Sequence, residues 1–214
     1  MKQFVSVKKH LTLIVNVDMI NARKEYKQKG EMKKRFASVY QFRITLEGIT
    51  PPIWRRIQVP ESYTFWDPHV AIQDAMGWKD YHLHKFTIIN PSTGAKENIG
   101  IPNEGVEVLP EWRQKISKWS SMKNKLAKYI YDFGDSWRHT VELEKILPRE
   151  NSIDYPRWID GKRACPPEDC GGKWGYEEIC RGESEYDDDF DPEYFDVKEV
   201  KFDNPDERWK KTFG

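Results

Sequence analysis

The 214-residue sequence has few cysteines, no net charge and no long apolar run. Three cysteines are too few for a disulfide scaffold at this length, and they indicate a reducing compartment. A formal net charge of zero excludes a generally basic nucleic-acid coat and a polybasic membrane-binding protein. The apolar run 11–17 is short and lacks a convincing cleavage site, so it suits neither a membrane span nor a secretory leader. We therefore expect a cytoplasmic protein with no membrane association.

Large aromatic side chains are plentiful by contrast. The chain has nine Trp, ten Tyr and ten Phe, and each such side chain can bury roughly 150–250 Å² of surface. Together with the balanced charge, this composition is outside the range typical of disordered chains. The sequence therefore predicts a folded protein with an aromatic core.

Charge is unevenly distributed along the chain. Residues 1–40 hold ten basic and three acidic side chains, residues 41–182 hold twenty of each, and residues 183–207 hold two basic and twelve acidic ones. The basic run 23–35 suits either a solvated linker or helix or a phosphate-binding arm. The acidic run 183–191 suits a solvated loop, a contact with the basic N-terminal segment or loose cation binding, but it lacks the ligand spacing of an EF-hand.

Alternating apolar and polar residues predict strands over 11–17 and 83–89. The same pattern over 39–59 predicts two antiparallel strands, because Pro51 and Pro52 place a turn between them.

A helix is predicted after the second of these strands. Asp67 is expected to be its N-cap and Pro68 its first helical residue. Gly77 suits a left-handed C-cap. The rest of the pattern predicts a helical or irregular stretch over 111–125, a hairpin with strands 129–132 and 137–143, a loop over 166–172, and helices over 174–181, 192–200 and 205–211.

Most of the predicted strand pairs are joined by short turns, which favours antiparallel pairing over a doubly wound parallel sheet. We therefore predict an α+β protein in which a mostly antiparallel sheet of hairpins packs against a few helices in a single domain.

Five ordered motifs resemble a known family, the plasmid Ri ORF-three-like proteins, also described as TnpR-like passenger proteins of insertion elements. The motifs are Pro51-Pro52-Ile53-Trp54-Arg55-Arg56-Ile57, Ala71-Ile72-Gln73-Asp74-Ala75-Met76-Gly77-Trp78, His82-Leu83-His84-Lys85-Phe86, Tyr131-Asp132-Phe133-Gly134-Asp135-Ser136-Trp137-Arg138-His139 and Cys165-Pro166-Pro167-Glu168-Asp169-Cys170-Gly171-Gly172, followed by Asp191-Pro192-Glu193 and Asn204-Pro205.

The resemblance covers roughly residues 38–213 and implies a compact α+β protein, often encoded near mobile elements, without an established activity. We expect a basic N-terminal extension over 1–37, a core over 38–182, and an acidic segment with closing helices over 183–214 in the same domain. Trp158 departs from the pattern, because many relatives are expected to have Cys there.

Histidines and carboxylates in these motifs are candidates for a pocket. His82 and His84 are two apart on a predicted strand, so both imidazoles would share one face and could bind a metal or a polar ligand. Asp132, Asp135 and His139 surround the predicted hairpin turn, where a carboxylate–imidazole pair could orient a general base or a metal ligand. Both groups could instead form local structural hydrogen bonds.

The cysteine-containing loop leaves three interpretations open. Cys165 and Cys170 could bind zinc with help from Cys180 or a histidine, form a disulfide, or belong to a rigid metal-free loop. Glu168 could start the following helix or face the histidines. In the Trp54-Arg55-Arg56 motif, alternation places the two arginines on opposite faces, so a single basic patch is not expected, and Trp54 is expected to be buried.

The sequence favours a non-catalytic binding or accessory module associated with mobile elements, and it leans against an enzyme. One alternative is a metal-assisted hydrolase in which a divalent ion is held by histidines and aspartates and Glu168 acts as general base. Its residues would be His82, His84, Asp132, Asp135, His139 and Glu168. Another is nucleic-acid binding through the basic run 23–35, and a protein partner is equally compatible with the first interpretation.

Overall fold

The structure is a computed structural model that describes residues 36–103, 107–184 and 190–213. The predicted strand 11–17 and the basic run 23–35 lie outside the described residues. No helix in the described part of the chain is long and apolar enough to cross a membrane.

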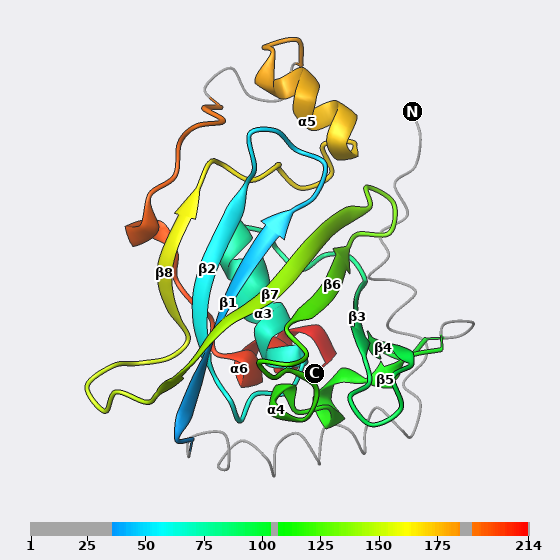
Figure 1. The fold of residues 1–214 in the computed structure, drawn as a ribbon. Coiled ribbons are helices and arrows are strands. Elements are labelled where there is room, and N and C mark those ends of the chain that lie inside the picture. Colours follow the sequence, from blue (N-terminus) through cyan, green and yellow to red (C-terminus); the bar gives the residue numbers. More distant parts are fainter. Residues whose placement is uncertain (1–35, 104–106, 185–189, 214) are drawn as a thin grey trace.

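An eight-stranded sheet organises these residues, in the order β5-β4-β3-β6-β7-β1-β2-β8 (Figure 1). Every neighbouring pair is antiparallel except β4 and β5. The strands are β1 (Ser38–Leu46), β2 (Trp54–Pro60), β3 (His84–Ile89), β4 (Lys96–Gly100), β5 (Leu109–Pro110), β6 (Leu126–Tyr131), β7 (Trp137–Pro148) and β8 (Arg157–Lys162). The predicted α+β class with a mostly antiparallel sheet is confirmed.

Short helices accompany the sheet. They are α3 (Trp66–Met76), the 3-10 helix η1 (Glu111–Arg113), α4 (Ile116–Trp119), α5 (Gly172–Cys180), the 3-10 helix η2 (Val197–Glu199) and α6 (Pro205–Phe213). Figure 1 shows α3 lying across the sheet, α6 beside α3, and α5 at the opposite end of the molecule.

The two predicted hairpins are present. Strand β1 pairs with β2 in a register that places Phe42 opposite Ile57, and β6 pairs with β7. The predicted N-cap is wrong: α3 begins at Trp66, and Asp67 lies in its first turn, where its carboxylate accepts a hydrogen bond from the Thr64 N–H. Gly77 ends the helix with φ 80°, as predicted.

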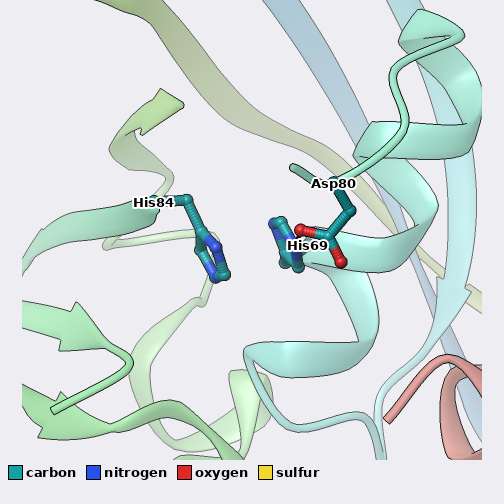
Figure 2. Close-up of side chains that lie close together, drawn as sticks. All are labelled: His69, Asp80 and His84. Carbon is teal, nitrogen blue, oxygen red and sulfur yellow. Dashed lines mark hydrogen bonds and ion pairs between the residues drawn. The ribbon is translucent and has the colours of Figure 1, made fainter. Parts of the chain in front are cut away.

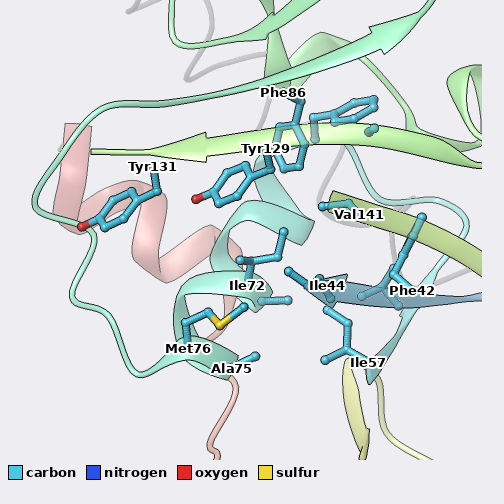
Figure 3. Packing of buried hydrophobic residues seen from close by; sticks show 14 of the residues in the cluster. Phe42, Ile44, Ile57, Ile72, Ala75, Met76, Phe86, Tyr129, Tyr131 and Val141 are labelled. Carbon is cyan, nitrogen blue, oxygen red and sulfur yellow. The ribbon is translucent and has the colours of Figure 1, made fainter. Parts of the chain in front are cut away.

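Buried side chains form a main core and a smaller one. The main core lies between α3 and the sheet and includes Phe42, Ile57 and Ile72 (Figure 3). A separate cluster contains Trp66, Val70, Trp112 and Trp209, with Phe213 packed against it. The smaller cluster therefore attaches α6 to the rest of the molecule.

Arg55 is buried, and its guanidinium joins the sheet to the loop after β8. It donates hydrogen bonds to the carbonyl oxygens of Trp54, Ala75, Lys162 and Arg163 and to the Cys165 sulfur at 2.8–3.0 Å. Arg55 thereby holds the start of the cysteine-containing loop in place.

The opposite face of β2 is polar, as alternation predicts. Arg56 forms a bidentate pair with Glu144, with the closer contact at 2.6 Å. Trp54 is only half-buried, which corrects the expectation that it is buried. The guanidinium groups of Arg43 and Arg56 lie 4.3 and 5.0 Å from the centre of its ring, which is within the range of cation–π contacts.

Candidate functional site

His82 lies in a partly exposed cluster of three carboxylates. Its Nε2 atom is 2.9 Å from Asp169 Oδ1, 3.7 Å from Asp132 Oδ2 and 4.0 Å from Glu168 Oε2. This nitrogen is shielded from solvent and has no contact of hydrogen-bond geometry, the short one with Asp169 included. We call His82, Asp132, Glu168 and Asp169 the His82 cluster.

Neighbouring groups orient two of these carboxylates. Asp132 Oδ1 accepts a hydrogen bond from the Gly134 N–H at 2.9 Å, which leaves Oδ2 facing His82. Glu168 Oε1 accepts hydrogen bonds from the Lys79 N–H at 2.6 Å and the Tyr131 hydroxyl at 3.0 Å, and Oε2 lies 3.3 Å from the same hydroxyl and 4.0 Å from His82 Nε2. Such outer hydrogen bonds are typical of carboxylates that bind metals.

The backbone around the cluster is strained. Asp132 and Asp169 have φ values of 53° and 55°, and Ser136 in the same hairpin turn has 61°. Left-handed conformations of non-glycine residues cost energy and concentrate at functional sites. The two strained aspartates both direct a carboxylate at His82.

Close packing brings the loop and the turn together. The Asp135 carboxylate accepts a hydrogen bond from the Gly171 N–H at 3.2 Å, so Asp135 holds the loop and does not face His82. A Cβ atom at Gly172 would lie 3.0 Å from the Asp135 carbonyl oxygen, so the close approach requires glycine there. Gly171 and Gly172 therefore allow the loop to pack against the β6–β7 turn, which brings the residues of the cluster together.

The His82 cluster has the donor set of a divalent-cation site. His82, Asp132 and Asp169 each offer one ligand atom within 4.8 Å of the others, and one imidazole with two carboxylates suits zinc, manganese or iron better than a thiolate-selective ion. Burial raises the pKa of Glu168, so this carboxyl also holds a proton more readily than an exposed glutamate. Because the cluster is partly exposed, a bound ion could reach ligands from solution.

A second polar cluster is buried between α3 and β3 (Figure 2). The imidazoles of His69 and His84 stack with centroids 3.4 Å apart and planes 5° from parallel. His69 Nε2 contacts Asp80 Oδ1 at 2.9 Å, and His84 Nε2 contacts Glu111 Oε2 at 2.7 Å. We call these four residues the buried histidine pair and its carboxylates.

The stack does not suit a shared metal ion, although His69, Asp80 and His84 lie close enough together. An imidazole nitrogen binds a metal through a lone pair in its ring plane, at about 2.0–2.1 Å. Two parallel rings separated by 3.4 Å direct their lone pairs into different planes. One ion therefore cannot lie in both planes.

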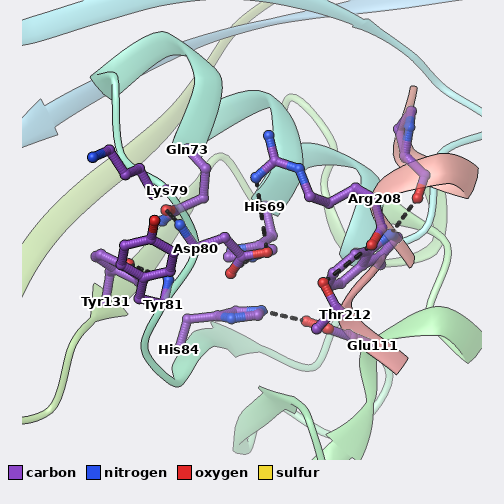
Figure 4. A network of polar contacts seen from close by, with 12 residues as sticks. His69, Gln73, Lys79, Asp80, Tyr81, His84, Glu111, Tyr131, Arg208 and Thr212 are labelled. Atoms are coloured by element: carbon purple, nitrogen blue, oxygen red, sulfur yellow. Dashed lines mark hydrogen bonds and ion pairs between the residues drawn. The ribbon is translucent and has the colours of Figure 1, made fainter. Parts of the chain in front are cut away.

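One short segment, residues 79–84, supplies both clusters, and Figure 4 shows its Lys79, Asp80, Tyr81 and His84. Lys79 and His82 contact carboxylates of the His82 cluster, whereas Asp80 and His84 face the interior. Asp80 has φ 59°, which allows the chain to direct successive side chains to different sides.

The structure separates the residues that the sequence grouped together. His82, Asp132 and Glu168 converge, but His84 points to the interior because β3 begins at His84 and strand alternation does not reach His82. His139 is buried beside Tyr129 and does not join either cluster, and burial lowers its pKa to about 4.

The cysteines occupy separate environments. Cys165 accepts from Arg55 and Cys170 lies 3.9 Å from the Gly172 carbonyl oxygen, and all three cysteines are free. Among the described residues, neither thiol belongs to a group of three potential metal ligands. Trp158, at the position expected to be Cys, packs on Phe195 instead.

Sequence analysis missed several of the clustered residues. Asp169 lies in the motif from Cys165 to Gly172, but the sequence does not reveal its left-handed backbone conformation or its contact with His82. His69, Asp80 and Glu111 come from three different elements, so only tertiary packing brings them to His84.

Comparisons with known proteins identify a family and a solved structure of similar fold. A family model described as plasmid pRiA4b ORF-3-like protein matches residues 38–207. The chain is 34% identical over 147 residues to an uncharacterised protein, y4hQ, of Sinorhizobium fredii, covering 67% of this chain and 72% of the relative. It is 49% identical to a protein of unknown function, MM3350, of Methanosarcina mazei, whose crystal structure matches with a TM-score of 0.74 over 78% of this chain and all of the other.

Proposed function

The chain belongs to the plasmid pRiA4b ORF-3-like family, and from that premise we propose that it is a non-catalytic binding module built around a divalent-cation site. The ligands are His82, Asp132 and Asp169, which each offer one ligand atom within 4.8 Å of the others, and Glu168 lies beside them. The observation that carries the proposal is the shielded His82 Nε2 atom, which has no hydrogen bond and is faced by one oxygen of each carboxylate.

The spacing of these atoms supports an ion between them. Two ligand atoms that each lie about 2.1 Å from one ion at tetrahedral angles are about 3.4 Å apart. The distances from His82 Nε2 to Asp169 and Asp132, 2.9 and 3.7 Å, bracket that value. The cation would also link the loop after β8 to the β6–β7 turn, since it takes ligands from both.

A second function, metal-assisted hydrolysis, is favoured by the raised pKa of Glu168. A carboxyl poised in this way beside a bound ion could transfer a proton during hydrolysis. Binding without catalysis remains our primary proposal, because the cluster lies at the surface of the loop and turn.

We also propose a cytoplasmic location and an accessory role near mobile elements. The three free cysteines support the location, and the plasmid origin in the family's description supports the role.

Calorimetric titration of chelator-treated protein with Mn²⁺, Zn²⁺ and Ni²⁺ tests the proposal. We expect saturable binding of one ion. At a free ion concentration 100 times the Kd, the free energy of unfolding should rise by about 2.7 kcal/mol. His82→Asn and Asp132→Asn should abolish both effects. Asp154→Asn, which removes an exposed aspartate elsewhere, is the matched control and should bind like the wild type.

Folded protein that binds none of these ions at millimolar concentration would refute the site. Metal-dependent turnover of a phosphoester or peptide substrate, lost in Glu168→Gln, would instead establish the hydrolase.

A further inference from the structure

Two exposed aromatic rings belong to residues that adjoin members of the His82 cluster in the chain. Tyr81 precedes His82 in the chain and is 45% exposed, and Phe133 follows Asp132 and is 43% exposed. Rings of this size usually lose most of their exposed surface on folding. Here each exposed ring is the immediate neighbour of a proposed metal ligand.

Each ring is accompanied by a lysine. The Lys79 ammonium lies 6.0 Å from the centre of the Tyr81 ring, and the Lys85 ammonium lies 5.8 Å from the centre of the Phe133 ring. The residues next to the cluster in the chain therefore offer two aromatic rings and two cations in addition to the proposed ion. A flat apolar group and an anion, linked in one molecule, match these features.

We propose that the metal-loaded His82 cluster binds single-stranded nucleic acid, an inference that rests on the proposed function. A phosphodiester oxygen binds the ion, the two lysines contact neighbouring phosphates, and Tyr81 and Phe133 each stack on a base. Aromatic side chains combined with cations are the common means of binding single strands without sequence preference.

The pairing of features favours a strand over other phosphate ligands. With two ring–lysine pairs, each next in the chain to a different metal ligand, a strand can engage both pairs, whereas a mononucleotide engages only one. A duplex hides its base faces within the stack, so it cannot use the exposed rings. Because residues 41–182 carry equal numbers of acidic and basic side chains, bulk attraction to this part of the chain contributes little, and binding at the His82 cluster should depend on the ion.

Fluorescence anisotropy with a labelled oligodeoxythymidine tests this inference on the full chain. We expect binding with Mn²⁺ and its loss on addition of chelator. Tyr81→Ala and Phe133→Ala should each weaken binding about 5- to 150-fold, the equivalent of one lost base stack. Tyr194→Ala removes an aromatic ring that is 51% exposed elsewhere and should leave the affinity unchanged.

The outcomes separate the two proposals. If Mn²⁺ raises the melting temperature of wild type and both ring variants but the oligonucleotide does not bind, the nucleic-acid inference falls and the cation site stands. If Mn²⁺ has no effect on melting temperature, both fall. Oligonucleotide binding that survives chelator or both ring substitutions also overturns the inference, as does equal competition by thymidine monophosphate or by a duplex.

Discussion

His69 and His84 stack in the interior with their ring centroids 3.4 Å apart, and each imidazole contacts a different carboxylate. At an effective dielectric constant of about 20, two positive charges at this separation repel by about 5 kcal/mol. It is therefore much less favourable for both rings to be positively charged than for one of them to be. This limits how the interior responds to acid.

The first prediction concerns the protonation of the pair. Burial, followed by the nearby His84, lowers the pKa of His69, so its ring should remain neutral well below pH 6.5. Nitrogen-15 chemical shifts of the two imidazoles during an acid titration would show this. Simultaneous protonation of both rings in the folded protein would contradict it.

The second prediction concerns His139 and stability. Burial lowers its pKa to about 4, whereas the unfolded chain takes up this proton near pH 6.5, so its contribution to stability is lost as the pH falls. The loss amounts to about 2 kcal/mol between pH 7.5 and 5. Urea unfolding of wild type and His139→Gln at both pH values measures it.

The comparison with a variant is needed because other groups oppose this trend. Burial raises the pKa of Asp74 to about 6, so its contribution is lost as the pH rises and not as it falls. The difference in pH dependence between wild type and His139→Gln isolates the histidine. Equal dependence in the two proteins would exclude this role for His139.

The third prediction concerns Arg55. Arg55→Met should destabilise the protein by about 3 kcal/mol or more, because buried carbonyl oxygens that now accept from the guanidinium would be left without donors. Arg56→Met is the control from the same strand and should cost less, since the Arg56–Glu144 pair is partly solvated. Similar losses by urea unfolding would contradict the contrast.

The fourth prediction concerns α6. Trp209 is 2% exposed in the small cluster, so Trp209→Ala should cost about 3–5 kcal/mol of local stability. Since this cluster is separate from the main core, hydrogen exchange should accelerate in α6 before the sheet. Trp174→Ala, at a residue 75% exposed on α5, should change stability by less than about 0.5 kcal/mol. Uniform acceleration throughout the sheet would indicate that α6 is not a separate unit.

Much of the candidate site was predictable because its residues lie in short motifs with restricted backbones. Asp132 adjoins a tight turn and Glu168 lies in a loop with two prolines, and the structure brings both to His82. The prediction that His84 shares a face with His82 was wrong, because it assumed strand alternation from His82 onward, whereas β3 begins at His84. Contacts such as His69–His84 depend on the packing of α3 against the sheet, which no local pattern encodes.

The fold follows the same division. The β1–β2 and β6–β7 hairpins were predicted from alternation and turn residues. Strand β8 was missed because Gly161 interrupts its apolar pattern, yet a Cβ there would lie 2.6 Å from the Trp158 ring. That glycine is required by close packing and not by a turn. The 3-10 helix Val197–Glu199 replaces the longer helix predicted over 192–200.

The strand order also constrains how the chain folds as it is synthesised. The β1–β2 hairpin emerges early, but the strands that flank it in the sheet, β7 and β8, come from residues 137–162. Until those residues leave the ribosome, both edges of the hairpin have unpaired backbone groups, and such edges can pair with other chains. We infer that the sheet is completed late, when β7 joins β6 to β1 and β8 pairs with β2. Newly made chains are most prone to aggregation before these two strands are added.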